Sequence, residues 1–402
     1  MTAIPRHRPH AGPAILSAGF RPFFLGAAIW AAAAIPIWLT AYAGGTIVPT
    51  LLPPLTWHVH EMVFGFAAAT VAGFLLTAIP NWTGRLPLQG WPLAGLVILW
   101  AAGRVGVLFS SRIGAPAASV ADLCFPAVFL AVVAREILAG KNWRNLPMLG
   151  ALALLLTGNA LVHLDALGLA DSAPLGSRTG LATLLMLIAL VGGRIIPSFT
   201  RNWMAKMRPD VPPPAPAGPL DLAALSVTGL ALAAWTIAPY AQATSWTVLV
   251  AGAALAWRLS RWRGQETVRE PLLLILHVGY GWLAFGLLLL GLNGIHEALP
   301  ETAALHALTV GAVGTMTLAV MTRASLGHTG RPLSAGPGTK AIYLLITIAA
   351  MLRVLSPLAG EQAVVALVLA GAAWSAAFGL FAILYGGPLA RSRIRGDAAK
   401  RI

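Results

Sequence analysis

The chain has 402 residues, of which 58% are hydrophobic and only 10% are charged. Soluble domains carry about 25% charged residues, so this composition excludes a soluble globular protein. Long apolar runs without alternation exclude a transmembrane β-barrel as well. The single cysteine, Cys124, lies within an apolar run and excludes both an intrachain disulfide and a thiolate metal site.

Apolar segments of spanning length recur along the whole chain. Each is long enough to cross a membrane core about 30 Å thick as a helix. They predict an all-α, polytopic membrane helix bundle of about twelve transmembrane helices, occupying 23–386. The segments lie at 23–43, 57–80, 93–110, 117–138, 147–168, 179–197, 220–240, 244–260, 271–295, 301–322, 340–357 and 361–386.

The basic residues predict the orientation of this bundle. Of the 27 Lys and Arg residues, 23 lie in the two tails and the even-numbered connections, which places both termini in the cytoplasm. We therefore expect cytoplasmic tails at 1–22 and 387–402, no cleavable signal peptide, and a Pro-rich cytoplasmic linker at 198–219. The net charge of +14 then reflects orientation and contact with anionic lipid, and no nucleic-acid partner is expected.

Segments 2, 6 and 10 carry related patterns. In segments 2 and 10 a histidine is followed by glycine five residues later and by Thr-Gly-Arg from 23 residues later; these are His60, Gly65 and 83–85, and His306, Gly311 and 329–331. A weaker copy in segment 6 has Ser177 in the place of the histidine and Pro197 in the place of Pro80. The pattern predicts a bundle of three four-helix pseudo-repeats.

Five of the nine histidines are predicted at the periplasmic ends of segments: His58, His60, His163, His296 and His306. Neutral imidazole is the commonest metal ligand and also holds haem iron. We expect a metal or haem site in the periplasmic half of the bundle. His277, in the inner third of segment 9, is a further candidate ligand. The alternative is that these histidines are interfacial, hydrogen-bonded residues.

Other ionisable residues accompany these histidines. Glu61, Asp165 and Glu297 lie close in sequence to candidate ligands and are expected to orient the imidazoles as hydrogen-bond acceptors. Arg104 and Arg353, within apolar segments, have two interpretations. They bind haem propionates near the outer surface, or Arg104 pairs with Asp122 of the next segment as a structural ion pair.

Several motifs are similar to those of the NnrS family of bacterial membrane proteins. They are GFRPFF at 19–24, WHVHEM at 57–62, GFLLTAIPNWTGR at 73–85, GRIIPSFT at 193–200, HALTVG at 306–311 and MTRASLGHTGR at 321–331. The resemblance implies an inner-membrane protein that contains haem, expected to be b-type, and copper. It also implies a role in nitric oxide metabolism, denitrification and resistance to nitrosative stress. Its ligands, its electron donor and its oligomeric state do not follow from the resemblance.

A looser resemblance is to the catalytic subunit of haem–copper oxidases and nitric oxide reductases. That subunit has twelve helices and a His-x-His pair, and His58 and His60 have this form. Here, however, the pair lies on segment 2 rather than segment 10. The adjacent His-His copper pair of those enzymes is absent from the sequence, which argues against a conventional binuclear centre.

These observations favour a protein that binds NO at a histidine-held metal and converts or sequesters it. Whether it is an enzyme is left open, and few polar residues in segments 2, 6 and 10 are available for proton delivery. The first alternative is a twelve-helix secondary transporter with a midplane site near Gly192, Gly193 and Pro197. The second is a haem- or metal-handling membrane protein without turnover.

Overall fold

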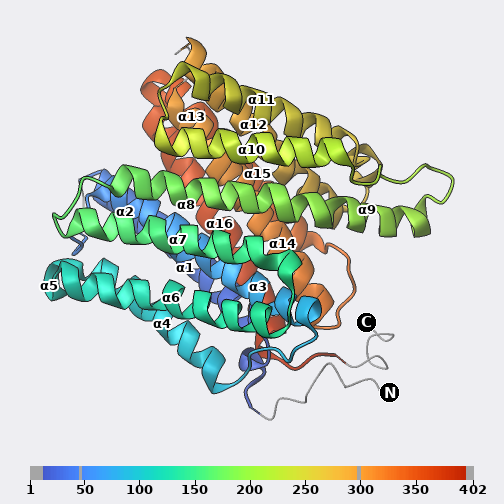
Figure 1. Ribbon diagram of the computed structural model, residues 1–402, viewed down its shortest axis with the longest axis horizontal. Coiled ribbons are helices and arrows are strands. Elements are labelled where there is room, and N and C mark those ends of the chain that lie inside the picture. The colour runs from blue at the N-terminus through green and yellow to red at the C-terminus, as the bar shows by residue number, and fades with distance from the viewer. Residues whose placement is uncertain (1–11, 45–47, 297–299, 395–402) are drawn as a thin grey trace. The chain divides into compact units, whose positions relative to one another are not determined.

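The computed structural model describes residues 12–44, 48–296 and 300–394, and its secondary structure there is entirely helical (Figure 1). Each segment that the sequence predicts overlaps a helix, as expected where lipid leaves no other partner for backbone groups. The first half comprises α1 (Phe20–Tyr42), α2 (Pro54–His60), η2 (Glu61–Ala67), α3 (Ala68–Thr83), α4 (Trp91–Leu108), α5 (Ser110–Ile113), α6 (Ala115–Ala139), α7 (Leu146–Ala166), α8 (Ala173–Leu187), η4 (Ile188–Gly192) and α9 (Gly193–Met207). The second half comprises α10 (Pro219–Ile237), α11 (Gln242–Ser260), α12 (Pro271–His296), α13 (Glu301–His306), η6 (Ala307–Gly314), α14 (Thr315–His328), α15 (Pro337–Leu355) and α16 (Ala363–Ala390).

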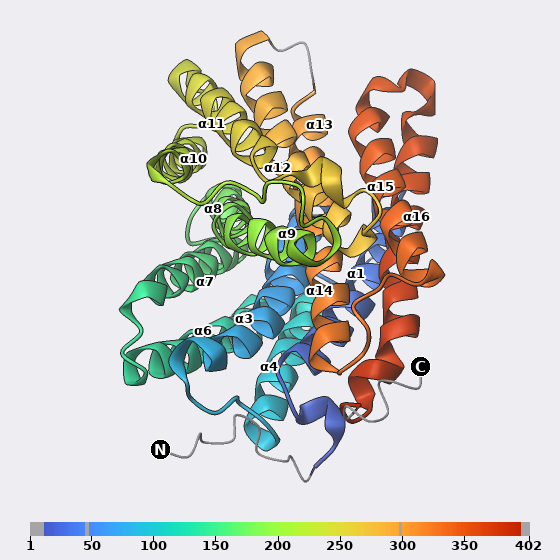
Figure 2. The same ribbon diagram turned by 90° about the vertical axis from the view of Figure 1, so that its right-hand side faces the viewer.

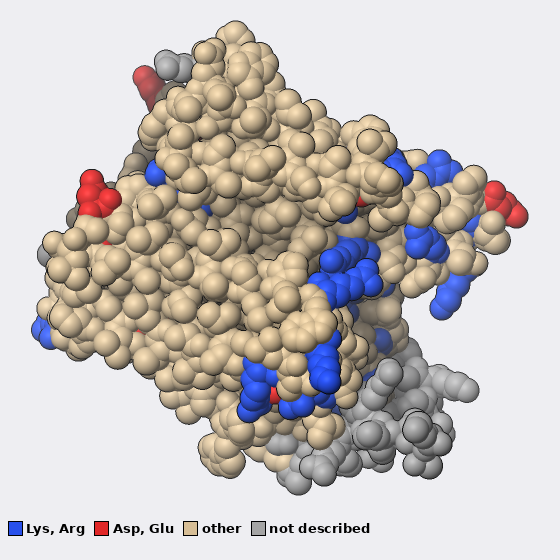
Figure 3. Space-filling view, in the orientation of Figure 1, with Lys and Arg blue, Asp and Glu red and all other residues tan. Residues whose placement is uncertain are grey.

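Eleven helical spans in the described part of the chain are long and apolar enough to cross a membrane, so the protein is an integral membrane protein. The one predicted segment outside these spans, 244–260, forms α11, which has 19 residues and a length of roughly 28 Å. Its polar residues keep it out of that set of eleven. On the face that Figure 3 shows, most of the surface is uncharged, and the Lys and Arg side chains gather mainly on one side.

The helices form two compact units. The first unit comprises residues 1–180, 324–332 and 382–402, and the second comprises 181–323 and 333–381. Three of the boundaries fall inside helices, namely α8, α14 and α16. The predicted Pro-rich linker begins inside α9, which continues to Met207, so its irregular part is 208–218.

In the first unit α1 packs on α3, and α6 packs on α3, α4 and α7 (Figure 1). Small residues allow these close approaches. A side chain at Gly103 would meet the backbone and carboxylate of Asp122 on α6, and one at Gly158 would meet the backbone of α8. Such small-residue contacts are typical of helix packing in lipid.

In the second unit α11 packs between α10 and α12, and η6 packs on α12 and α15. A buried arginine, Arg258, links four of its elements. Its Nε donates to Asp221 of α10 at 3.0 Å, and its Nη1 donates to the carbonyl of Ala189 in η4 at 2.9 Å and to the hydroxyl of Tyr280 on α12 at 3.0 Å. This network gives the Ala189 carbonyl a hydrogen-bond donor within the π-helical η4. It also pairs the buried charge of Arg258 with the carboxylate of Asp221.

Segments 2, 6 and 10 each contain a π-helical stretch: η2, η4 and η6. In segments 2 and 10 the stretch begins directly after His60 and His306. Both segments also end at a left-handed glycine, Gly84 (φ 71°) and Gly330 (φ 76°). The two copies therefore share structural as well as sequence features. Segment 6 differs, since η4 begins eleven residues after Ser177.

Candidate metal centre

A cluster of buried polar side chains lies among α1, α2, η2, α4, α6 and α7 of the first unit. Its ionisable members are almost inaccessible to solvent, with exposed fractions between 0% and 4%. Polar groups are costly at such sites unless they are paired or functional. The members of this polar cluster are Trp30, His60, Glu61, Arg104, Ser119, Asp122, Asn159 and His163.

His60 is held at both ring nitrogens. Its Nδ1 lies 2.9 Å from Oε1 of Glu61, and its Nε2 lies 3.1 Å from Oδ2 of Asp122 and 2.8 Å from Oδ1 of Asn159. A neutral imidazole has only one N–H. His60 is therefore either an imidazolium that donates in both directions or a neutral ring with one N–H. That N–H lies on Nε2, toward Asp122 and Asn159, or on Nδ1, toward Glu61, which directs the lone pair of Nε2 toward the Asp122 and Asn159 oxygens. The arrangement with the N–H on Nδ1 is typical of a metal-binding histidine.

His163 approaches the same carboxylate oxygen, with its Nε2 at 2.9 Å from Oδ2 of Asp122. Its Nδ1 lies 3.1 Å from Oγ of Ser119, and that hydroxyl donates to the carbonyl of Ala115 at 2.8 Å. Because the hydroxyl proton is directed to Ala115, Ser119 accepts the Nδ1–H of His163, which leaves Nε2 unprotonated when the ring is neutral. Single ligand atoms of His60, Asp122 and His163 thus lie within 4.8 Å of one another.

Arg104 holds both carboxylates of the polar cluster. Its Nη1 donates to Oε2 of Glu61 at 2.7 Å, and its Nη2 forms an ion pair with Oδ1 of Asp122. Trp30 donates to Oε2 of Glu61, and Asn159 donates to Oδ2 of Asp122, both at 2.8 Å. One guanidinium and two carboxylates leave a formal charge of −1 when both imidazoles are neutral. One further positive charge, on a proton or a metal ion, is needed to offset it.

Local sequence explains how these side chains meet. A side chain at Gly65, inside the π-helical η2, would collide with Arg104, Glu61 and Trp30, so the glycine leaves the space that they occupy. The Gly65 carbonyl accepts a hydrogen bond from Trp100 Nε1 at 2.9 Å. On α7, Asn159 and His163 are four residues apart and share a face, as Ser119 and Asp122 do at a spacing of three on α6.

Four of the predicted site residues meet in the polar cluster: His60, Glu61, Arg104 and His163. Arg104 forms the ion pair with Asp122 that is one of its two predicted interpretations. Sequence reasoning missed Trp30, Ser119 and Asn159. Asn159 lies four residues before His163, and Ser119 lies three residues before Asp122. These spacings place each pair on one helix face and could have indicated both residues.

Two predicted residues of the first unit lie elsewhere. The ring of His58 stacks on Trp38 with centroids 4.3 Å apart. The Asp165 carboxylate accepts hydrogen bonds from the backbone N–H groups of Ser172 and Ala173, both at 2.9 Å, at the start of α8. Its hydrogen bonds therefore cap a helix instead of orienting His163.

The other predicted site residues belong to the second unit. The buried His277 has its Nε2 3.0 Å from the hydroxyl of Thr200, and His296 is exposed at the end of α12. His306 Nδ1 lies 2.6 Å from the Thr302 carbonyl, and Arg353 donates to Ser356 at 2.9 Å. Glu297 lies outside the described residues. The histidines predicted at one level are thus distributed over both units, and the polar cluster contains two of them.

The donor set of the polar cluster fits a single metal ion. Two imidazole nitrogens and a carboxylate suit copper, iron or zinc. A haem does not fit between His60 and His163, because the Asp122 carboxylate contacts the Nε2 atoms of both rings and occupies the space that a macrocycle would require. The two rings are also close and steeply inclined, with centroids 5.4 Å apart and an interplanar angle of 78°.

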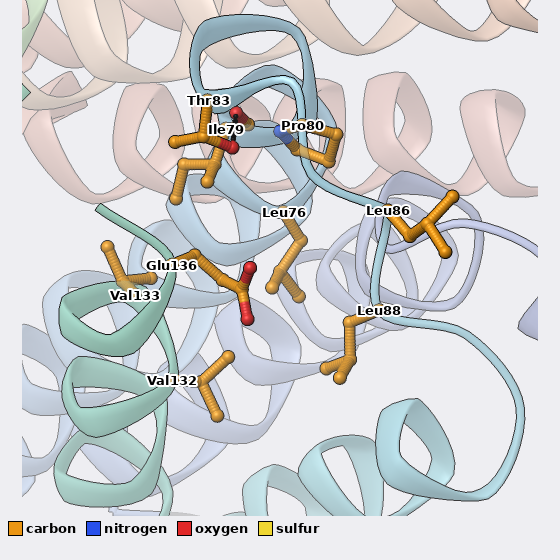
Figure 4. Close-up of a pocket in the computed structure, with 9 residues that line it drawn as sticks. All are labelled: Leu76, Ile79, Pro80, Thr83, Leu86, Leu88, Val132, Val133 and Glu136. Carbon is orange, nitrogen blue, oxygen red and sulfur yellow. Dashed lines mark hydrogen bonds between the residues drawn. The ribbon is translucent and has the colours of Figure 1, made fainter. Parts of the chain in front are cut away.

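A pocket in the same unit lies at the opposite ends of α3 and α6 (Figure 4). Its wall is mostly apolar, and the Glu136 carboxylate points into it. Glu136 forms ion pairs with Arg85 and Arg135. The pocket contains no histidine and shares no residue with the polar cluster. It is lined by Leu76, Ile79, Pro80, Thr83, Leu86, Leu88, Val132, Val133 and Glu136.

Comparison with known proteins supports the resemblance seen in the motifs. The family model described as NnrS protein matches residues 14–393. No curated protein matches the chain. Because the family match covers nearly the whole length, including every helix of the polar cluster, the chain belongs to the NnrS family.

Proposed function

We propose that this NnrS-family membrane protein binds one metal ion, copper or iron, at His60, Asp122 and His163, and that it serves the bacterial response to nitric oxide. The convergence of two imidazole Nε2 atoms on one buried carboxylate oxygen, at 3.1 and 2.9 Å, carries the proposal. The uncompensated charge of the polar cluster also favours a cation. We place the protein in the inner membrane, with both termini cytoplasmic and the polar cluster in the periplasmic half. The distribution of Lys and Arg supports this placement.

The burial of the polar cluster fits a small neutral ligand. His60, Asp122 and His163 are exposed by no more than 4%, so charged solutes would meet a large desolvation cost. Nitric oxide is small and uncharged and partitions into lipid. A bound copper or iron ion would supply a coordination position for it. Glu61 fixes the Nδ1–H of His60, and Arg104 fixes Glu61 and Asp122. These residues are sufficient to hold a metal ion that binds and sequesters nitric oxide. We do not propose that the protein reduces nitric oxide.

Haem, which the family resemblance implies, is not assigned to the polar cluster. Because a haem does not fit between His60 and His163, the histidines outside the polar cluster, such as His306 at the end of α13, are the candidate haem ligands. An absorption spectrum of the purified protein tests this assignment. A Soret band that persists in His60→Ala and is lost in His306→Ala is expected if haem is present. The reverse result would contradict the assignment.

Metal analysis of purified variants tests the proposed ion site. The wild type and His58→Ala are expected to retain about one copper or iron per chain, because His58 stacks on Trp38 outside the polar cluster. His60→Ala, His163→Ala and Asp122→Asn are expected to lose the ion and the NO-dependent change in its electron paramagnetic resonance spectrum. Gel filtration and circular dichroism establish that the variants are folded. Full metal content in all three variants would refute the site.

The main alternative is a purely structural ion-pair network completed by a proton on an imidazole. The Arg104–Asp122 ion pair favours it, because a guanidinium beside a carboxylate competes with a metal. A wild-type protein that takes up neither copper nor iron after reconstitution would establish this alternative. The transporter interpretation requires an unwound helix near Gly192 and Gly193. There the chain is helical, with η4 followed directly by α9.

A further inference from the structure

Three arginine side chains gather in the first unit where the ends of the chain meet α14. This arginine cluster consists of Arg21 in the first turn of α1, Arg331 in the turn after α14, and Arg391 after the end of α16. Figure 2 shows these helix ends close together. The side chain of Arg21 joins α1 to the end of α16, since its Nη1 donates to the backbone carbonyls of Leu389 and Arg391, both at 2.7 Å.

The arginine cluster has no acidic partner in the described part of the chain. Arg331 and Arg21 interact as like charges, and so do Arg391 and Arg331. Burial and the neighbouring Arg391 guanidinium lower the pKa of Arg331. Nη1 of Arg331 is buried without a hydrogen-bond partner in the protein. A buried donor left unsatisfied is unfavourable, so this cluster has both unused hydrogen-bonding capacity and excess positive charge.

Other arginine groups of the protein differ in this respect. Arg85 and Arg135 share the carboxylate of Glu136, and Arg258 and Arg261 share that of Asp221. In each of these groups an acidic side chain of the protein offsets part of the positive charge. Among the described residues, no acidic side chain does this for the arginine cluster at Arg331, which is therefore suited to a further anion.

We propose that the arginine cluster binds a phosphate group, of an anionic phospholipid or free in solution. A guanidinium binds phosphate oxygens through two parallel hydrogen bonds, which would satisfy Nη1 of Arg331. The site lies at the ends of three membrane-spanning helices, the level at which headgroups are found. The predicted orientation places it at the cytoplasmic leaflet, where anionic lipids occur.

Two sequence motifs outside the polar cluster meet at this site. Arg21 belongs to the motif at 19–24 and Arg331 to the motif at 321–331. The ring of His328 packs against Phe20 with centroids 5.4 Å apart. The backbone N–H of Ile394 donates to the Thr329 carbonyl at 3.0 Å, which fixes the segment after Arg391 against the turn. A phosphate site gives these residues a shared role.

Lipid binding by the full-length protein tests the proposal. The protein is placed in nanodiscs of phosphatidylcholine with increasing phosphatidylglycerol, and bound lipid and unfolding temperature are measured. Arg331→Gln and Arg391→Gln are expected to weaken phosphatidylglycerol binding at least tenfold. Arg144→Gln removes an exposed arginine from another connection and is expected to cause a loss of about fivefold or less, the effect of one unspecific surface charge. Equal losses in Arg331→Gln and Arg144→Gln would overturn the proposal.

Stability in pure phosphatidylcholine separates a binding defect from misfolding. There Arg331→Gln is expected to unfold at the wild-type temperature or above, because the substitution removes the charge that repels both Arg21 and Arg391. A clearly lower unfolding temperature would show a structural role and overturn the proposal.

Titration of inorganic phosphate in detergent identifies the source of the anion. If phosphate stabilises the wild type but does not stabilise Arg331→Gln, the ligand is free phosphate. Stabilisation by phosphatidylglycerol alone indicates the headgroup, and no effect of either refutes the site.

Discussion

Asp122 connects most of the polar cluster, because its two oxygens face Arg104, Asn159 and the two imidazoles. The sequence predicted the ionisable members but not the neutral ones. A charged or imidazole side chain in an apolar segment is rare enough to indicate a site. Neutral side chains such as Ser119 and Asn159 are common in membrane helices, and they gain meaning only when another helix brings them a partner.

Arg104→Met tests whether this arginine compensates the buried carboxylates. The substitution removes the guanidinium that pairs with both Glu61 and Asp122, two carboxylates at sites that are at most 1% exposed. We expect a loss of about 3–5 kcal/mol in the free energy of unfolding of chelator-treated protein. Adding Asp122→Asn to Arg104→Met should recover part of that loss. Arg112→Met, at an exposed position, serves as the control in a denaturation series. Equal stability of Arg104→Met and wild type would contradict the network.

At the scale of the element, the π-helical stretches decide where side chains of segments 2 and 10 point. Apolar length predicts that a helix crosses the membrane, because in lipid every backbone group must bond within the segment. It does not reveal a π-helical stretch, which changes the register within a helix and has no composition of its own. Such stretches frequently lie at functional sites, and η2 directly follows His60. The sequence therefore predicted the helix but not the geometry with which it presents Glu61.

Gly65→Ala tests the fit of η2 against the polar cluster. The added Cβ would collide with Arg104, Glu61 and Trp30, so we expect a loss of about 1–3 kcal/mol together with reduced metal content. Gly95→Ala on α4 is the matched control, because nothing lies within 4 Å of its added Cβ. That control should be stabilised by about 0.5–1 kcal/mol through its higher helix propensity. Unchanged metal content in Gly65→Ala would show that η2 does not position the ligands.

At the scale of the whole molecule, the sequence predicted the helical segments and the family, and both are confirmed. It did not predict two compact units, because their boundaries fall within helices and follow from tertiary packing. The expectation that five histidines form one site came only from their predicted depth along the membrane normal. Depth does not determine which helices are neighbours, and the structure brings His163 to His60 but assigns His296 and His306 to the other unit.

The topology of α11 is the point at which the predicted twelve helices and the eleven apolar spans differ. Tyr240, exposed before α11, and Gln265, exposed after it, lie on opposite sides of the membrane if α11 crosses. The excess of Lys and Arg in even-numbered connections requires this crossing, because omitting it would invert every later connection. In a Cys124→Ala background, a membrane-impermeant maleimide applied to spheroplasts should label Tyr240→Cys. Gln265→Cys should be labelled only after permeabilisation, as should the control Asp210→Cys between α9 and α10. Labelling of both Tyr240→Cys and Gln265→Cys from one side would show that α11 does not span, and that the charge pattern has been assigned to the wrong faces in the second half of the chain.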